Sequence, residues 1–221
     1  AIDPLYRTRG SRSLYYQGKT LSRLKLEINM KNFDRIEEEV SQRLSSKRFE
    51  HSKQVAKTAA ELALKWGCDQ DQAYLAELLH DVAREMPLAM QVELLKYEGI
   101  ELLPEEEKTS ALLHASVSAI VTREDFGIDD PEILEAIVQH TIGGTNMSPL
   151  GCILYLADAI EPGRDYRGVE KIRKLAYQDL DQALLAAYDN TIGYLKDHQC
   201  WIHPVTLIGR EELAKSIAER R

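Results

Sequence analysis

The sequence predicts an all-α fold, a compact domain built from many helices, and three observations support this. From residue 32 onward, apolar residues recur every three or four positions, which is the spacing of one helix face. No segment keeps the alternation of apolar and polar residues that marks a half-buried strand. Signals for the start and end of helices separate the periodic segments. With 221 residues and 44% hydrophobic content, the chain can bury one sizeable core.

Residues 1–29 differ from the rest of the chain in composition. They carry six basic and two acidic residues and show little periodicity. Met30 has the position of a natural start, so we expect residues 1–29 to be an extension that is either disordered or added during cloning. An Arg- and Ser-rich leader with few acids is also the composition of a transit peptide. The domain itself is expected to span residues 30–221.

Three punctuation signals mark the clearest helix ends. Gly67 follows the periodic run that ends at Trp66, which suits a helix C-terminus. Asp130-Pro131 and Ser148-Pro149 each place a capping side chain before a proline at the first helical position. The helices expected from period and punctuation together cover residues 32–44, 47–66, 70–82, 87–97, 109–125, 131–140, 149–160, 169–175, 180–195 and 204–219.

The charge balance and the cysteines limit the classes of partner and compartment. The formal net charge is −8, which argues against nucleic acid or an anionic membrane as a partner. The three cysteines lie far apart, so neither a disulfide framework nor a Cys-based zinc site fits. No stretch approaches the ~20 apolar residues of a membrane span. We therefore expect a soluble cytoplasmic protein, in which a phosphate-bearing ligand would need local positive charge.

Six polar side chains occupy positions where the helical period calls for apolar ones. His51, for example, lies on one helix face with Val55 and Leu62, and that face should be buried. The other five are His80, Asp81, His114, His140 and Asp158. A buried carboxylate or imidazolium without a partner costs several kcal/mol, so each of these groups needs one.

These six residues together predict a buried metal site rather than a structural polar core. For a single buried histidine, a structural hydrogen bond is the simpler explanation. Imidazoles and carboxylates brought together by several helices instead have the composition of a divalent metal site, because neutral imidazole and ionised carboxylate both coordinate such an ion. His203, which precedes Pro204 at a helix start, suits either a turn or a function.

The order of these residues resembles the HD superfamily of metal-dependent phosphohydrolases, whose signature is a histidine, a His-Asp doublet and a distant aspartate. The matching segments are residues 48–52 (RFEHS), 78–83 (LLHDVA), 140–143 (HTIG) and 155–164 (YLADAIEPGR). Within that superfamily the chain looks like the YqeK branch, and the Ala-Asp-x-Ile-Glu-Pro-x-Arg block at 157–164 is the most specific element. The resemblance covers about residues 32–210 and implies the HD-domain fold.

The resemblance implies an enzyme that hydrolyses diadenosine tetraphosphate and related dinucleoside polyphosphates symmetrically, giving two ADP. It also implies a divalent transition metal, iron in first place, with manganese, cobalt or magnesium as alternatives. The implied metal ligands are His51, His80, Asp81 and Asp158. The implied nucleotide contacts are Arg48, His114, His140, Thr141, Arg164 and the segment that contains His203, Pro204 and Thr206.

The expected roles follow from charge and from the number of ions. The expected catalytic residues are Asp81, His114, His140 and Arg164, and the arginines expected to neutralise phosphate charge are Arg48, Arg84 and Arg164. The site is expected to hold one ion or two, with His114 and His140 as the candidate ligands of the second.

The sequence departs from the family pattern at two positions. Arg84 stands where many HD proteins have lysine, and Gly144 stands where the relatives often have arginine. The preferred length of the polyphosphate can therefore differ.

Two other functions use the same residues. An HD-type nucleotidase or nucleoside-triphosphatase would share the metal centre but release different products. A nucleotide-binding regulator would keep the metal without turnover, and the intact ligand positions argue against it. The expected partner is a nucleotide small molecule, and a homodimer is the candidate assembly.

Overall fold

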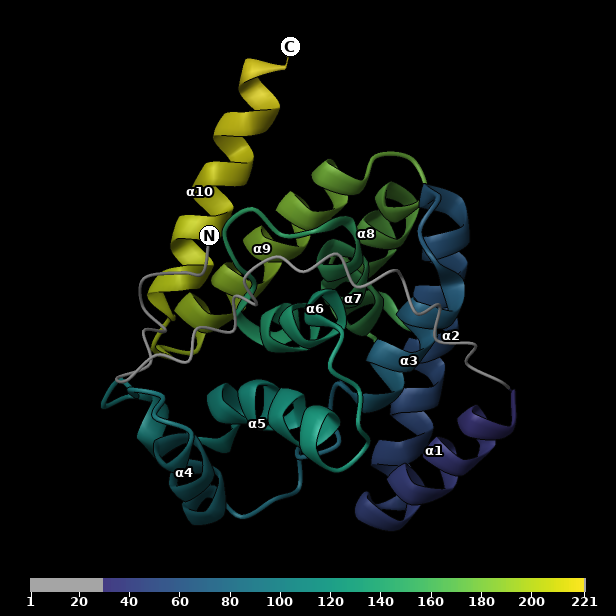
Figure 1. The fold of residues 1–221 in the computed structure, drawn as a ribbon. Helices are drawn as coiled ribbons and strands as arrows, with labels where there is room; N and C mark the ends of the chain where they lie inside the picture. The colour runs from purple at the N-terminus through teal and green to yellow at the C-terminus, as the bar shows by residue number, and fades with distance from the viewer. Residues whose placement is uncertain (1–29, 221) are drawn as a thin grey trace, which may run out of the picture.

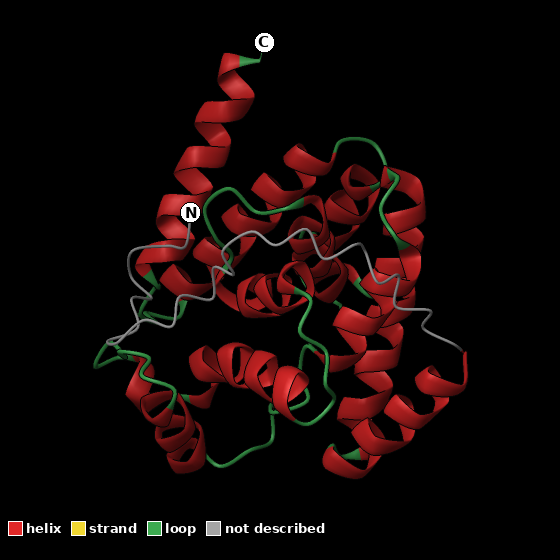
Figure 2. Cartoon of the chain, viewed as in Figure 1, coloured by secondary structure: helices red, strands yellow, loops and turns green. Residues whose placement is uncertain are grey.

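A computed structural model describes residues 30–220, and the expectations about residues 1–29 lie outside them. The described residues form helices joined by loops and contain no strand (Figure 1, Figure 2). The predicted all-α fold is therefore confirmed. The helices are α1 (Met30–Arg43), α2 (Ser46–Trp66), α3 (Gln70–Leu79), α4 (Leu88–Tyr97), the 3-10 turn η2 (Glu106–Lys108), α5 (Ser110–Glu124), α6 (Pro131–Ile142), α7 (Pro149–Ile160), α8 (Val169–Ala176), α9 (Leu180–Asp197) and α10 (Pro204–Glu219).

Helix α7 is central to the core. Its residues from Leu150 to Ala157 are all buried, and it packs against α2, α6 and α9. Leu62 of α2, Leu78 of α3 and Ile137 of α6 are fully buried around it. Burying each of these side chains stabilises the fold by about 1.5–3 kcal/mol. Polar side chains that project inward from these same helices therefore meet in one buried place.

Side-chain caps determine where the helices around this place begin. The Ser45 hydroxyl accepts a hydrogen bond from the backbone N–H of Arg48, so Arg48 lies in the first turn of α2. Asp130 and Ser148 cap α6 and α7 in the same way. Gly67 ends α2 with a left-handed backbone, φ 73°, which favours glycine. The helix ends predicted at these glycine, aspartate and serine residues are confirmed.

The end of the third helix differs from the sequence expectation. Helix α3 ends at Leu79, not at residue 82. His80 and Asp81 lie in tight turns over residues 80–85, in which the N–H of Arg84 bonds the carbonyl of Asp81, three residues back. Neighbouring side chains on a helix point about 100° apart, so leaving the helix lets both face one centre. The other expected ends coincide with those of the structure or differ from them by one or two residues, and η2 was not expected.

Helix α10 lies at the edge of the fold. It packs on α9, and its C-terminal half extends away from the other helices (Figure 1). Among the helices that the structure describes, none combines the length and the apolar character needed to cross a bilayer.

Candidate metal centre

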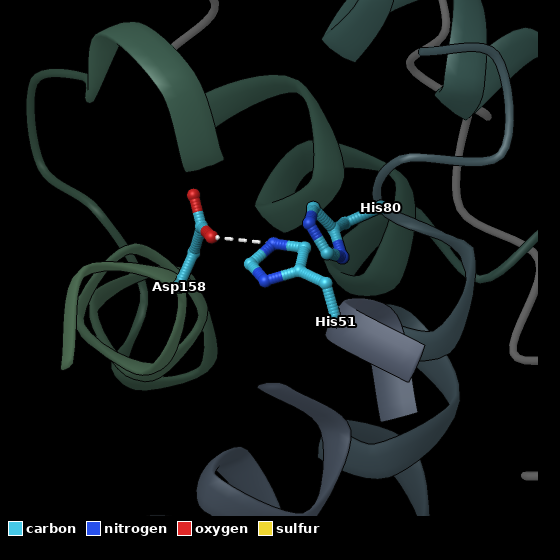
Figure 3. Close-up of side chains that lie close together, drawn as sticks. All are labelled: His51, His80 and Asp158. Carbon is cyan, nitrogen blue, oxygen red and sulfur yellow. Dashed lines mark ion pairs between the residues drawn. The ribbon is translucent and has the colours of Figure 1, made fainter. Parts of the chain in front are cut away.

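Imidazole and carboxylate side chains from separate parts of the fold meet at one buried centre. His51 comes from α2, His80 from the turn after α3, and Asp158 from α7. In Figure 3 these three point toward one another, and Nε2 of His51 lies 3.1 Å from Oδ1 of Asp158. The ring centroids of His51 and His80 are 5.8 Å apart, and those of His80 and His140 are 4.7 Å apart.

Asp81 is buried between the histidines. Its Oδ1 lies 3.1 Å from Nε2 of His114 and 3.8 Å from Nε2 of His140. Its Oδ2 lies 2.9 Å from Nη1 of Arg48 and 3.4 Å from Nε2 of His80. The structure thus brings together all six polar residues that the helical pattern singled out, and one carboxylate contacts groups on both sides of the cluster.

The donor atoms fit a divalent cation. One ligand atom each from His51, His80 and Asp158 lies within 4.8 Å of the other two, and the same holds for His80, Asp81 and His140. Nε2 of His51 and Nε2 of His80 are buried and have no hydrogen-bond partner among the described residues. Leaving such a nitrogen without a partner costs about 1–3 kcal/mol, whereas coordination of a cation would satisfy it. Imidazole and carboxylate are also the ligands that borderline divalent ions accept.

Hydrogen bonds behind two of the rings decide which nitrogen faces the centre. Nδ1 of His80 lies 2.5 Å from the carbonyl oxygen of Glu77, and Nδ1 of His140 lies 2.6 Å from that of Ile137. A carbonyl oxygen only accepts, so Nδ1 carries a proton in both rings. When these rings are neutral, Nε2 presents its lone pair to the centre, as a metal ligand must.

His114 has the opposite arrangement. The guanidinium of Arg84 lies 2.8 Å from its Nδ1, closer than the Ser110 carbonyl at 3.2 Å. Because a guanidinium only donates, Nδ1 accepts and Nε2 carries the proton. That N–H lies 3.1 Å from Oδ1 of Asp81 and 3.1 Å from Nε2 of His140. The geometry therefore favours a donor role for His114 over its predicted role as a ligand of a second ion.

The carboxylates of the centre are ionised. Burial opposes their charge, but the imidazole of His80 holds the pKa of Asp81 well below its usual range. The imidazole of His51, with Nε2 3.1 Å from Oδ1, likewise lowers the pKa of Asp158 against the effect of burial. Burial lowers the pKa of His140 to about 3, so this ring is neutral at neutral pH. Ionised carboxylates and neutral imidazole are the protonation states that cation binding requires.

Metal affinity should depend on pH through His80. Burial disfavours the charged ring, but the carboxylates of Asp81 and Glu77 raise the pKa of His80 well above its usual value. The metal-free protein therefore keeps a second proton on His80 at neutral pH, and a cation has to displace it. Displacing one proton should lower the affinity about tenfold for each pH unit of acidification, with activity falling in parallel. Competition with a chelator would measure this, and a constant affinity between about pH 8 and pH 6 would contradict it.

An open pocket of about 590 Å³ adjoins the centre at the N-terminus of α2. Its lining includes Lys47, Arg48, His51, Glu85, Glu161 and Arg164. Lys47 and Arg48 lie in the first turn of α2, where basic side chains oppose the helix dipole. A bound anion would offset this unfavourable interaction between the basic side chains and the helix dipole, so the pocket suits phosphate groups next to the centre. Lys47 was missed in the sequence, although its place in a first helical turn was a usable signal.

Two of the predicted phosphate-binding arginines are paired with the centre. Nη1 of Arg48 donates to Oδ2 of Asp81 at 2.9 Å. Arg164 forms an ion pair with Oδ1 of Asp158 and donates from Nε to the backbone carbonyl of the same residue at 2.7 Å. Both arginines also line the pocket, so each contacts both the centre and the open space. The predicted Thr141 is close by, because its Oγ1 lies 3.0 Å from a nitrogen of the centre, Nε2 of the preceding histidine.

The predicted C-terminal contacts have partners within the fold. His203 is buried, and its Nε2 lies 3.3 Å from Oε1 of Glu106. The hydroxyl of Thr206 donates to the carbonyl of Ile142 at the end of α6, at 2.8 Å. Pro204 is the first residue of α10. This segment thus packs against the C-terminus of α6, and its contact with a nucleotide stays a prediction.

Two buried glutamates lie behind the histidines, and the sequence analysis gave neither of them a role. Oε1 of Glu161 lies 3.4 Å from Nδ1 of His51, and its Oε2 accepts a hydrogen bond from the N–H of Gly163. Oε2 of Glu77 lies 3.0 Å from Nδ1 of His80, and burial raises the pKa of Glu77 to about 7. The signal for Glu77 was a carboxylate inside an apolar run, which is the criterion that selected the histidines.

Comparison with known proteins agrees with this geometry. Residues 48–163 match the family described as HD domain. The chain is 39% identical over 179 residues to a protein of Halalkalibacterium halodurans named symmetrical bis(5'-nucleosyl)-tetraphosphatase, covering 79% of this chain and 92% of that protein. A Bacillus subtilis protein of the same name is 36% identical over 176 residues, covering 76% of this chain and 90% of that protein.

A solved structure gives the same picture for the fold. It is a crystal structure from Clostridium acetobutylicum, described as a predicted HD superfamily hydrolase involved in NAD metabolism. Its TM-score to this chain is 0.81 and its sequence identity is 40%, over 83% of this chain and 97% of that one. The helical arrangement that carries the centre is therefore shared with a solved relative.

Proposed function

We propose a function from the premise that the chain belongs to the HD domain family and, within it, to the symmetrical bis(5'-nucleosyl)-tetraphosphatases. The chain is a metal-dependent hydrolase of diadenosine tetraphosphate that releases two ADP. One observation carries the proposal. Two buried imidazole nitrogens without hydrogen-bond partners among the described residues lie beside ionised aspartates, next to a pocket with basic side chains in its wall. The proposed substrates include related dinucleoside polyphosphates, since the basic side chains of the pocket wall are proposed to bind phosphate groups.

The proposed ligands are His51, His80, Asp81 and Asp158. Both groups of ligand atoms at the centre use His80, and one imidazole nitrogen binds one cation at a time, so we infer a single ion. Imidazole and carboxylate together suit iron, manganese or cobalt better than magnesium, and iron is the ion that we propose. When bound, such an ion supplies Lewis acidity toward a phosphoryl oxygen and makes water a stronger acid near neutral pH.

The chain's own residues bind and orient the polyphosphate. Lys47, Arg48 and Arg164 neutralise phosphate charge at the pocket wall. His114 offers its Nε2–H, and Thr141 its hydroxyl, as donors at the inner side of the centre. The oxygen of water forms a bond to an inner phosphorus and releases a proton to solvent, while the central P–O bridge breaks and the other ADP departs with the bridging oxygen. The departing ADP ends in a phosphate whose second pKa is about 6, so it leaves without a dedicated general acid.

Product identification tests the proposed reaction. Chromatography of a reaction of metal-loaded protein with diadenosine tetraphosphate should show ADP alone, because attack at either inner phosphorus with loss of the other half gives two ADP. Equal ATP and AMP would place the cleaved bond one position away and contradict the proposed binding register. Nucleoside, or nucleoside monophosphate from mononucleotides, would instead identify a nucleotidase or nucleoside-triphosphatase. Tight binding without any product would identify a regulator.

We also propose a cytoplasmic location. Cys68, Cys152 and Cys200 are all free thiols in the described structure, and unpaired cysteines are typical of a reducing compartment.

A further inference from the structure

Glu77 is a fully buried carboxylate one helical turn before His80. Neither of its oxygens has a hydrogen-bond partner within the part of the chain that the structure describes. Its Oε2 nevertheless lies 3.0 Å from Nδ1 of His80. An ionised carboxylate in a dry core is strongly unfavourable unless a positive charge lies beside it. His80 is the group beside Glu77 at which such a positive charge can lie, either on a proton or on a cation at Nε2.

His80 is contacted by Glu77 twice on the side away from the centre. Nδ1 lies 2.5 Å from the carbonyl oxygen of Glu77 and 3.0 Å from its carboxylate. On the other side, Nε2 is buried, faces Asp81 at 3.4 Å and has no hydrogen-bond partner among the described residues. A negative charge behind Nδ1–H increases the electron density that Nε2 can donate to a cation.

His51 also has a carboxylate behind its Nδ1, but that carboxylate has other partners. Nδ1 of His51 is backed by Glu161, but Glu161 also accepts a hydrogen bond from Gly163 and lies 3.7 Å from the guanidinium of Arg164. The charge of Glu161 therefore has uses outside the centre. That of Glu77 is directed at a single imidazole, whose positive charge comes from a proton or from a cation at Nε2.

We propose that Glu77 is a positioning residue of the metal centre, whose negative charge behind the Nδ1–H of His80 raises the affinity of Nε2 for a divalent cation. This inference rests on the proposed function, because it assumes that His80 is a metal ligand. It assigns a role to a residue that does not contact the substrate, and it predicts an effect on metal binding before any effect on catalysis.

The variant Glu77→Gln tests the proposal, because glutamine keeps the size and an acceptor oxygen but removes the charge. Its affinity for Mn²⁺, measured by competition with a chelator, should be roughly 10- to 100-fold lower than that of the wild-type protein. The visible spectrum of the Co²⁺-loaded variant should also differ, since the donor strength of one ligand changes. Unchanged Mn²⁺ affinity and an unchanged Co²⁺ spectrum would overturn the proposal.

Glu106→Gln is the matched control. Glu106 is also buried and also faces a histidine, since its Oε1 lies 3.3 Å from Nε2 of His203. A general loosening of the fold would weaken Mn²⁺ binding in both variants equally, and that result would overturn the specific role of Glu77. A wild-type protein that binds no divalent ion would instead refute the proposed function itself, so the two failures are distinguishable.

A measurement on the wild-type protein keeps the proposal testable if the variant does not fold. Nitrogen NMR of the Zn²⁺-loaded protein reports which imidazole nitrogen carries the proton. The proposal expects a strongly hydrogen-bonded proton on Nδ1 of His80, identified by its loss in His80→Gln. A proton on Nε2 of His80 in the Zn²⁺-loaded protein would overturn the proposal.

Discussion

Alanine in place of Asp81 should remove the bound ion and lower the hydrolysis of diadenosine tetraphosphate by about 10³-fold or more, because several kcal/mol of transition-state stabilisation depend on that ion. The structure gives the reason. Asp81 contacts His80, His114 and Arg48 at 2.9 to 3.4 Å, so its loss leaves one cation and several ring nitrogens without their shared carboxylate. His80→Ala should behave alike, because both groups of candidate ligands use His80.

Metal analysis and thermal unfolding measure this effect together. An ion present at 100 times its Kd stabilises the folded state by about 2.7 kcal/mol, and both variants should lose that increment. Asp189→Ala is the control, since Asp189 pairs with Arg210 at the exposed surface at 2.8 Å and should keep both metal and activity. Full metal occupancy in purified Asp81→Ala would reject the ligand assignment.

The second large effect is expected at Arg164. Its guanidinium pairs with Asp158 and also lines the pocket. An ion bound to Asp158 would neutralise its carboxylate in place of the guanidinium, which would then be available for phosphate. Arg164→Ala should therefore lower kcat/KM roughly 10- to 100-fold, the loss of one or two charge-assisted hydrogen bonds. The bound metal should remain, because removing a nearby positive charge favours a cation.

Steady-state kinetics with metal analysis of the same samples would measure the change. Arg164→Lys should recover part of the loss, since lysine keeps the charge without the two-pronged geometry. Arg210→Ala, which removes an arginine from an exposed ion pair, provides the control. An unchanged kcat/KM in Arg164→Ala would show that this guanidinium does not contact the substrate. Loss of the metal from Arg164→Ala would show instead that the guanidinium serves to hold Asp158 in place.

The helical class and the polar centre follow from one-dimensional patterns. Apolar spacing predicts the helices, and His51, His114 and Asp158 are visible because each interrupts an apolar helix face. Local chemistry also predicts the helix ends where a capping residue or glycine is present, as at Gly67. What the pattern does not contain is the role of each residue. The resemblance to a family supplied the distinction between a metal ligand and a substrate contact.

Features that depend on tertiary packing could not be predicted in this way. The early end of α3 at Leu79 has no glycine or proline to mark it, because the surrounding fold rather than local propensity turns the chain there. The contact of Arg84 with His114 joins residues 30 positions apart, and it decides which nitrogen of that ring carries the proton. Glu77 could have been found, since the rule that selected the histidines also applies to a carboxylate in an apolar run.

The production of ADP from diadenosine tetraphosphate by metal-free and metal-reloaded protein tests the central claim most directly. Protein stripped with a chelator should form no ADP. Adding Fe²⁺ without oxygen should restore ADP as the sole nucleotide product, with activity rising until one ion is bound per chain and then remaining level. Undiminished ADP production by protein shown to be free of metal would contradict the claim that these histidines and aspartates form the catalytic metal centre.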